Sequence, residues 1–399
     1  MKKKSNRITE VKVGTAVAGG LLTLIIGFVV GLNWNNFFPG FKSYLGFKSS
    51  SVESIDLSEV NNLYSVLKEN YDGDLDKSKL VEGAKKGLVA ATGDVYTTYM
   101  NNEEARDYRA SLNGEIAEAG IGVSIAKRED YVRVIRTLPD NPARKAGVLA
   151  GDIIYAIDDE EVWQLDVDVI ATKLRGKKGS KVKVTVVRNN KKKDFTMTRE
   201  EINNVSADIT YKKDIGIISI YRFSKDTGTL VSKLAKEAVD KKVKGVIIDL
   251  RGNGGGYVEA ARSMLSLWSD GETVLTQKSR TIGNTNMAAF HGKAILKDVK
   301  TVVLINGTTA SASEIVAGAL KDYEKAKIVG EKSYGKGVVQ SLLEVNGGLL
   351  KVTSAHWYTP KDNTINGTGI VPDVEVERTY DQINKDQDPQ LDKALELLK

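Results

Sequence analysis

The chain has 399 residues, 28% of them charged and 41% apolar, so it is long enough for several folded domains and unlike disordered proteins in composition. It contains no cysteine and only two histidines, which excludes disulfides, thiol catalysis and cysteine-bound zinc and disfavours a histidine metal site. The net charge of +6 comes from scattered lysines among 52 acidic residues, a pattern of solvated faces rather than of a nucleic-acid-binding surface.

The first predicted element is a membrane anchor. Residues 1–12 are basic, and residues 13–32 carry no charge over about the twenty residues that a bilayer span needs. A cleavable signal peptide is the alternative, but the apolar run is long for one and no clear A-x-A-like site follows it. Because lysines precede the span and are diluted after it, we expect an uncleaved, single-pass signal anchor with a cytoplasmic N-terminus and the other domains outside the cytoplasm.

A linker and a helical region follow the predicted anchor. Residues 33–52 show little periodicity and contain glycine and serine, as expected for a tether. In residues 53–112, apolar side chains such as Leu57, Val60 and Leu63 recur at helical spacing, which predicts a small helical region. Its role is either internal packing or the pairing of subunits.

The rest of the chain divides into a β-rich domain and an α/β core. Residues 113–200 contain short apolar strands from Gly120 onward and one helical pattern at 165–174, and they have the size of a small domain. Residues 201–399 alternate buried strands with helices, which predicts an α/β core.

The stretch TASASEIVAGAL places two serines between a buried strand and a predicted helix. A strand-to-helix turn can expose a nucleophile beside the positive end of a helix dipole. Ser311-x-x-Glu314 is also the pattern of a capping box, in which the serine merely caps the helix. This motif alone leaves both interpretations open.

A second stretch, SYGKGVVQ, places Lys336 between two glycines. The glycines allow a tight turn that brings the amine into a confined site. A lysine in a partly desolvated site can lose its proton near neutral pH and act as a general base, in place of a histidine. Glycine-flanked lysines are also common on exposed turns, so this motif too is weak by itself.

Taken together, NGTTASASEIVAGALKDYEKAKIVGEKSYGKGVVQ resembles the carboxyl-terminal processing peptidases, a family of PDZ-containing serine proteases with a Ser/Lys catalytic pair. The resemblance implies that Ser311 is the nucleophile, Lys336 the general base and Gln340 the residue that orients the lysine. It implies that Ser313 is a small packing or capping residue. It also implies that neither a metal nor an organic cofactor is needed.

The oxyanion donors follow from the same comparison. The amide of Ala312, next to the nucleophile, is one natural donor. DLRGNGGG resembles the family's strand-end glycine turn and predicts a second donor at Gly256, with Gly255 as the next choice. A phosphate-binding loop is the alternative for this segment, but the Lys and Ser/Thr of a P-loop do not follow it. Many relatives carry proline where Gly254 stands, which puts the particular donor in doubt.

The β-rich domain resembles a PDZ domain. GIGVSI resembles a carboxylate-binding loop, so Gly120, Ile121, Gly122 and Val123 are predicted to bind a substrate's carboxyl terminus through backbone amides and strand pairing. Arg175, in the closing segment LRGKKGSKVKV, either links peptide capture to the active site or is a solvated turn residue.

The resemblance implies a multidomain fold of α/β and α+β character. In this fold a transmembrane helix and a helical segment precede a PDZ domain at 113–200, which is inserted before a crotonase-like ββα protease core at 201–399. The implied protein is a membrane-anchored endopeptidase that acts on proteins and peptides bound by their carboxyl-terminal regions. It is expected to form a homodimer and not to bind nucleic acid.

Three rival hypotheses accompany this prediction. One is a PDZ adaptor that retains an inactive protease-like core, although an adaptor has no need of Ser311, Lys336 and Gln340 together. Another is a membrane-anchored structural protein in which Ser311 only caps a helix. The third is a Ser/His/Asp triad, but neither His291 nor His356 lies in a recognisable triad context.

Overall fold

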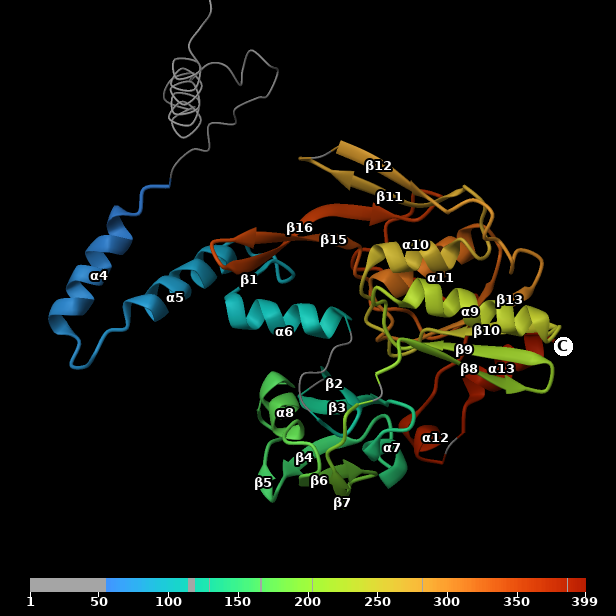
Figure 1. The fold of residues 1–399 in the computed structure, drawn as a ribbon, viewed down its shortest axis with the longest axis horizontal. Helices are drawn as coiled ribbons and strands as arrows, with labels where there is room; N and C mark the ends of the chain where they lie inside the picture. The colour runs from blue at the N-terminus through green and yellow to red at the C-terminus, as the bar shows by residue number, and fades with distance from the viewer. Residues whose placement is uncertain are drawn as a thin grey trace, which may run out of the picture. The chain divides into compact units, whose positions relative to one another are not determined.

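The computed structural model describes residues 55–113, 119–128, 130–165, 167–202, 204–281, 283–385 and 387–399 (Figure 1). None of the helices in these ranges is both long enough and apolar enough to cross a membrane. The predicted cytoplasmic tail, the predicted anchor at 13–32 and the predicted linker at 33–52 all lie outside the described residues. The chain divides into two compact units, residues 1–76 and 77–399.

The described part of the first unit contains one helix, α4 (Ser58–Asn70). Its apolar residues Val60, Leu63 and Val66 recur at helical spacing, as the sequence predicts. All three side chains are exposed, and no residue of the helix is buried. The helix therefore presents an apolar stripe that its own unit does not cover.

Within the second unit, the β-rich domain is built on a six-stranded sheet. Five of its strands lie in the order β2-β3-β4-β6-β7, and the sixth, β5, pairs with β4. The core lies between this sheet and two helices, with buried side chains such as Val134, Ile154 and Ile170. The elements are β2 (Val123–Arg128), β3 (Tyr131–Thr137), α7 (Pro142–Ala146), β4 (Ile153–Ile157), β5 (Glu160–Glu161), α8 (Val167–Leu174), β6 (Lys181–Arg188) and β7 (Lys191–Thr198).

The α/β core is built on a six-stranded sheet in the order β17-β14-β13-β10-β9-β8. The five strands from β17 to β9 pair in parallel, and β8 joins β9 in antiparallel fashion. The strands are β8 (Ala207–Lys212), β9 (Ile215–Ile220), β10 (Gly245–Asp249), β13 (Lys300–Ile305), β14 (Lys327–Gly330) and β17 (Val374–Glu375). Parallel pairing explains why these strands read as continuous apolar runs, since both of their faces are covered.

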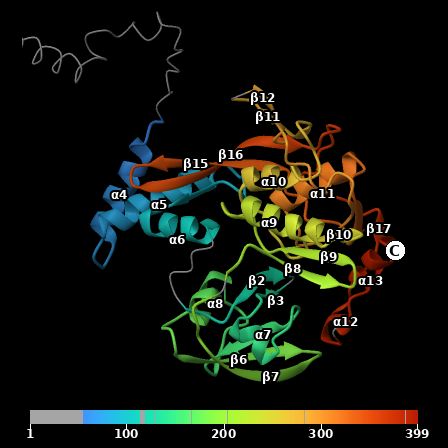
Figure 2. The ribbon, with the colours of Figure 1, turned by 45° about the vertical axis from the view of Figure 1, so that its right-hand side comes forward.

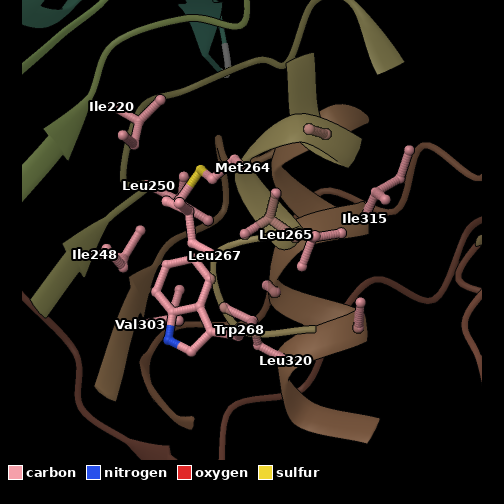
Figure 3. Packing of buried hydrophobic residues seen from close by; sticks show 14 of the residues in the cluster. Ile220, Ile248, Leu250, Met264, Leu265, Leu267, Trp268, Val303, Ile315 and Leu320 are labelled. Carbon is pink, nitrogen blue, oxygen red and sulfur yellow. The ribbon is translucent and has the colours of Figure 1, made fainter. Parts of the chain in front are cut away.

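Helices pack on both faces of this sheet. On one face, α9 (Thr227–Asp240), α10 (Val258–Leu265) and α11 (Ala312–Asp322) enclose the main core, in which Trp268 packs near Leu250 and Leu265 (Figure 3). The Trp268 indole N–H donates to the Thr301 hydroxyl at 2.8 Å, which satisfies the polar atom of a buried aromatic ring. On the other face, α13 (Pro389–Leu397) covers a smaller apolar cluster. The short helix α12 (Tyr380–Asn384) precedes α13.

A second sheet joins segments from both ends of this unit. Its order is β1-β16-β11-β12, with β15 paired to β16. The elements are α5 (Lys77–Ala90), β1 (Thr98–Met100), α6 (Asn102–Asn113), β11 (Thr273–Ser279), β12 (Gly283–Ala288), β15 (Val338–Val345) and β16 (Gly348–Tyr358). β1 pairs with β16, and α6 packs against β16. Figure 2 shows α6 below the strands β15 and β16. The region predicted as helical at 53–112 thus also supplies a strand to the sheet formed by residues after the β-rich domain.

Candidate active site

Ser311 lies in the turn between β13 and α11, as predicted, and its backbone is strained. It has φ 55° and ψ −119°, a region that residues other than glycine rarely adopt. Such a conformation costs about 1–3 kcal/mol and persists only where the surroundings enforce it. Helix caps normally use extended backbone instead. The strained turn therefore points to a role for Ser311 beyond capping.

Glu314 connects this turn to the lysine loop. Its Oε2 accepts hydrogen bonds from the amides of both Ser311 and Lys336, each at 2.9 Å. Its Oε1 accepts from the Ser333 hydroxyl at 2.5 Å and from the Gly335 amide at 2.7 Å. The Glu314 side chain is fully buried, and this burial raises its pKa while the four donors act in the opposite direction. One carboxylate thus holds the backbones of two loops that are distant in sequence, a role that the capping-box pattern did not reveal.

Lys336 and Gln340 are brought together as predicted. The Lys336 Nζ donates to Gln340 Oε1 at 2.9 Å. Burial lowers the pKa of Lys336, and the nearby charge of Lys351 lowers it further, against opposing effects of Asp94 and Glu314. This shift is in the direction that a general base requires, because it makes the neutral amine easier to reach.

A cavity of about 460 Å³ is lined by Ser311, Lys336 and Gln340 together with Gly255 and Gly256. Its other lining residues, many of them apolar or aromatic, are Tyr108, Leu112, Gly254, Tyr257, Val258, Gln277, Val338, Val339 and Leu342. In the described part of the chain, no hydrogen bond joins the side chains of Ser311 and Lys336. Catalytic hydrogen bonds often tighten only when substrate binds, so this geometry is compatible with a resting site.

Two neighbouring amides of the glycine turn, those of Gly255 and Gly256, differ in whether they already have an acceptor. The Gly255 amide donates to Asn253 Oδ1 at 2.9 Å and is therefore already used. Among the described residues, neither the Gly256 amide nor the Ala312 amide has an acceptor. A Cβ atom placed on Gly255 would lie 2.9 Å from the Ala312 nitrogen, so the turn and the start of α11 are in close contact. This arrangement favours Gly256 and Ala312, rather than Gly255, as the donors to an oxyanion.

The other serine and the two histidines lie in different environments. Ser313 is buried, and its hydroxyl donates to the Asn253 carbonyl at 3.0 Å, so it supports the glycine turn. His291 and His356 are both exposed, and neither lines the cavity at Ser311. Their positions give no support to a Ser/His/Asp triad.

The predicted carboxylate-binding loop lines a second, smaller cavity of about 110 Å³ in the β-rich domain. The Gly120 amide is already used, because it donates to the Glu200 carbonyl at 2.9 Å. Ile121, Gly122 and Val123 line the cavity, as does the exposed Arg175. Within the described ranges, Arg175 makes no ion pair or side-chain hydrogen bond, so its predicted link to the active site is not seen.

Family models match three parts of the chain. Peptidase family S41 matches residues 214–376, and a PDZ domain matches residues 119–198. The N-terminal domain of the activating protease CtpB matches residues 42–104. The chain therefore combines an S41 protease core of mixed α/β fold with a PDZ domain.

Curated relatives include a CtpA-like serine protease of Staphylococcus aureus strain N315, which is 32% identical over 338 residues, or 84% of this chain and 68% of the relative. A CtpA-like serine protease of Staphylococcus saprophyticus is also 32% identical, over 339 residues, with the same coverage of 84% and 68%. The chain belongs to the carboxyl-terminal processing peptidases. It is a serine-type peptidase of this family, and the adaptor and purely structural hypotheses are wrong.

Solved structures agree with this membership. The photosystem II D1 C-terminal processing protease aligns with a TM-score of 0.61 at 25% identity, over 81% of this chain and 87% of that one. An S41 protease from Bacteroides fragilis aligns with a TM-score of 0.53 at 15% identity, over 77% and 87% of the two chains, and shares the fold. The processing-peptidase fold thus extends across most of the second unit.

Proposed function

We propose that the chain is a membrane-anchored endopeptidase that cleaves peptide bonds with Ser311 and Lys336 through an acyl-enzyme. The observation that carries this proposal is the shared cavity, in which Ser311, Lys336 and Gln340 lie with the free amide of Gly256. The strained serine backbone and the lowered pKa of Lys336 support the same roles.

Each chemical step has a residue to perform it. The neutral Lys336 amine takes the Ser311 hydroxyl proton as Ser311 Oγ attacks the peptide carbonyl. The amides of Gly256 and Ala312 donate to the oxyanion, and Lys336 then protonates the leaving amine. Water, activated by the same lysine, hydrolyses the ester and frees the serine.

Substrate delivery and cell location complete the proposal. The smaller cavity at residues 120–123, called the PDZ groove, binds the carboxyl-terminal region of a protein substrate. The part of the substrate that precedes this region then reaches Ser311. The uncharged stretch at 13–32 anchors the enzyme, with its catalytic domains outside the cytoplasm. The exposed apolar stripe of α4 supports a homodimer, because a second copy would cover it.

The decisive experiment measures cleavage of an unstructured protein with an apolar carboxyl terminus by the full chain in detergent micelles. Ser311→Ala and Lys336→Ala are compared with wild type, and Lys332→Ala, an exposed lysine of the same loop, is the matched control. We expect wild type and the control to cut and the other two variants to fold without cutting. Cleavage at the wild-type rate by the Lys336 variant would refute the Ser/Lys mechanism.

Covalent labelling tests the identity of the nucleophile separately. A fluorophosphonate probe should add one mass increment to wild type and to Ser313→Ala, and none to Ser311→Ala. Peptide mapping should place the label on Ser311. A label on Ser313 would reverse the roles assigned to the two serines.

Anchoring and assembly have their own tests. Membrane fractionation with external protease should release the folded domains and leave the amino-terminal segment in the membrane. Light scattering should give twice the mass of one chain, and charged substitutions at Val60 and Leu63 should reduce it to one. Release without protease, or an unchanged mass, would contradict the anchor or the dimer respectively.

A further inference from the structure

The short segment at residues 94–97, between α5 and β1, touches the lysine end of the candidate active site. It lies ahead of the matched PDZ domain and the matched S41 core. The Tyr96 carbonyl accepts a hydrogen bond from Gln340 Nε2 at 2.5 Å. The Lys336 Nζ lies 5.1 Å from the centre of the Tyr96 ring, within the range of a cation–π contact. Residues 94–97 are called the 94–97 turn below.

We propose that the 94–97 turn is a positioning element of the active site, in which Tyr96 fixes the orientation of Gln340 and thereby the direction of the Lys336 amine. The proposal deepens the Ser/Lys mechanism and rests on it. It assigns a role in the reaction to a part of the chain that the sequence placed in a region for packing or pairing.

The chemistry of the glutamine amide supports this role. A backbone carbonyl can only accept a hydrogen bond, so Tyr96 requires the NH₂ end of Gln340 to face it. The Gln340 oxygen is then left to accept from Lys336, at 2.9 Å. A neutral amine has one lone pair, and fixing one of its N–H bonds restricts where that lone pair can point. Without the Tyr96 carbonyl, Gln340 could rotate and present a donor to the lysine.

The turn itself is built to hold this carbonyl in place. Asp94 Oδ1 accepts from the Tyr96 amide at 3.0 Å, and Asp94 Oδ2 accepts from the Thr97 hydroxyl at 2.6 Å. The Thr97 hydroxyl in turn accepts from the Thr353 amide on β16 at 3.1 Å. Pairing of β1 with β16 begins at the next residue, Thr98. The turn is therefore attached to β16, and β16 also pairs with β15, the strand that carries Gln340.

The test uses full-length variants in micelles and compares kcat with KM on the same protein substrate. Thr97→Val removes the hydroxyl that joins Asp94 to β16, and Tyr96→Ala removes the ring beside Lys336. We expect kcat to fall about tenfold or more for each, because misplaced catalytic groups lose rate steeply, while KM stays within twofold. Both Tyr96 variants keep the backbone carbonyl, so Tyr96→Ala tests the ring beside Lys336, whereas Thr97→Val tests the support of the carbonyl. Tyr96→Phe keeps the ring as well and should retain most of the wild-type rate.

Two controls separate positioning from loss of stability. Val81→Ala changes an exposed side chain of α5, outside the 94–97 turn, and should leave kcat unchanged. Met100→Ala removes a buried side chain of β1, and should lower the melting temperature at least as much as Thr97→Val with a smaller loss of kcat. An equal loss of kcat in Met100→Ala would show a merely structural role and overturn the proposal.

The proposal and the Ser/Lys mechanism fail in distinguishable ways. If Lys336→Ala is inactive but Thr97→Val and Tyr96→Ala keep the wild-type kcat, the 94–97 turn has no positioning role and the mechanism stands. If Lys336→Ala is active, the mechanism itself is wrong. A fall in kcat with unchanged KM in both turn variants, beside an inactive Lys336→Ala, supports both.

Discussion

The PDZ groove and the catalytic cavity both contain a glycine-rich turn, but they are assembled differently. The groove, about 110 Å³, is lined largely by apolar residues, together with Gly120 and Gly122 of the predicted carboxylate-binding loop. The catalytic cavity, about 460 Å³, contains a serine from one segment and a lysine and a glutamine from another. Glu314 holds these two segments together. The lining of the groove therefore comes from within residues 120–202, whereas the lining of the catalytic cavity comes from segments spread over residues 108–342.

The largest effect on stability and on kcat should come from removing the Glu314 carboxylate, which joins the Ser311 segment to the Lys336 segment. Glu314→Gln replaces an acceptor of four hydrogen bonds with an amide whose NH₂ would face donors. We expect a loss of about 2 kcal/mol in the free energy of unfolding and a fall of about 10²-fold in kcat. Urea unfolding and kcat measurements test this, with the exposed Glu324→Gln as control. A kcat within twofold of wild type would show that Glu314 does not position the catalytic residues.

A substitution of Gly256, in the glycine turn at 249–256, should lower kcat by a comparable factor while leaving the hydrogen bonds of Glu314 in place. At Gly256, φ is 141° and an added Cβ would lie 2.1 Å from the Phe223 carbonyl oxygen. Gly256→Ala must therefore move the proposed oxyanion donor, and we expect kcat to fall about 10²-fold. Gly254→Ala is the matched control, since an added Cβ there meets nothing within 4 Å. Equal kcat in the two variants would contradict the assignment of Gly256.

The corresponding glycine substitution in the PDZ groove should affect binding instead of rate. Gly122 has φ 75°, and an added Cβ would lie 2.2 Å from the Cβ of Asn141. Gly122→Ala should weaken binding of a carboxyl-terminal peptide about tenfold and raise KM, with kcat within about twofold of wild type. Fluorescence anisotropy with a labelled peptide measures the first effect, and the exposed Lys191→Ala is the control. A fall in kcat with unchanged peptide affinity would remove the distinction between the two sites.

The sequence predicted the local features of both sites well. The strand and helix on either side of Ser311 form as β13 and α11. The resemblance to the family implied that Gln340 orients Lys336, and the two side chains are hydrogen-bonded. The resemblance to the family was needed to relate these motifs, because 24 residues separate Ser311 from Lys336 and no local pattern shows that they share a cavity.

What the sequence did not predict depends on contacts between distant segments or on weak patterns. The strand β1 lies inside a region predicted as helical, and only its pairing with β16 stabilises it as a strand. The strand β7 has no clear apolar alternation, because its first four residues, Lys191 to Asp194, are charged and exposed. The bonds from Glu314 to the Lys336 loop and from Tyr96 to Gln340 likewise leave no periodic signal.

The smallest expected effect concerns the charge around Lys336. The pKa of Lys336 is lowered first by burial and then by Lys351, while Asp94 and Glu314 raise it. Because the neutral amine is the proposed base, activity should rise as the pH rises through this pKa. Lys351→Met removes a like charge, so the pKa of Lys336 should rise and the acid limb of the kcat/KM profile should move to higher pH.

Asp94→Asn removes a negative charge near Lys336, so its effect on the pKa of Lys336 should be opposite to that of Lys351→Met. The pKa of Lys336 should fall, and the acid limb should move to lower pH. The asparagine oxygen can still accept from the Tyr96 amide, so the turn retains one of its bonds and the plateau rate should fall less than in Thr97→Val. Shifts in the same direction for both variants would mean that a group other than Lys336 controls the acid limb, whereas opposite shifts identify the lysine amine as the titrating base.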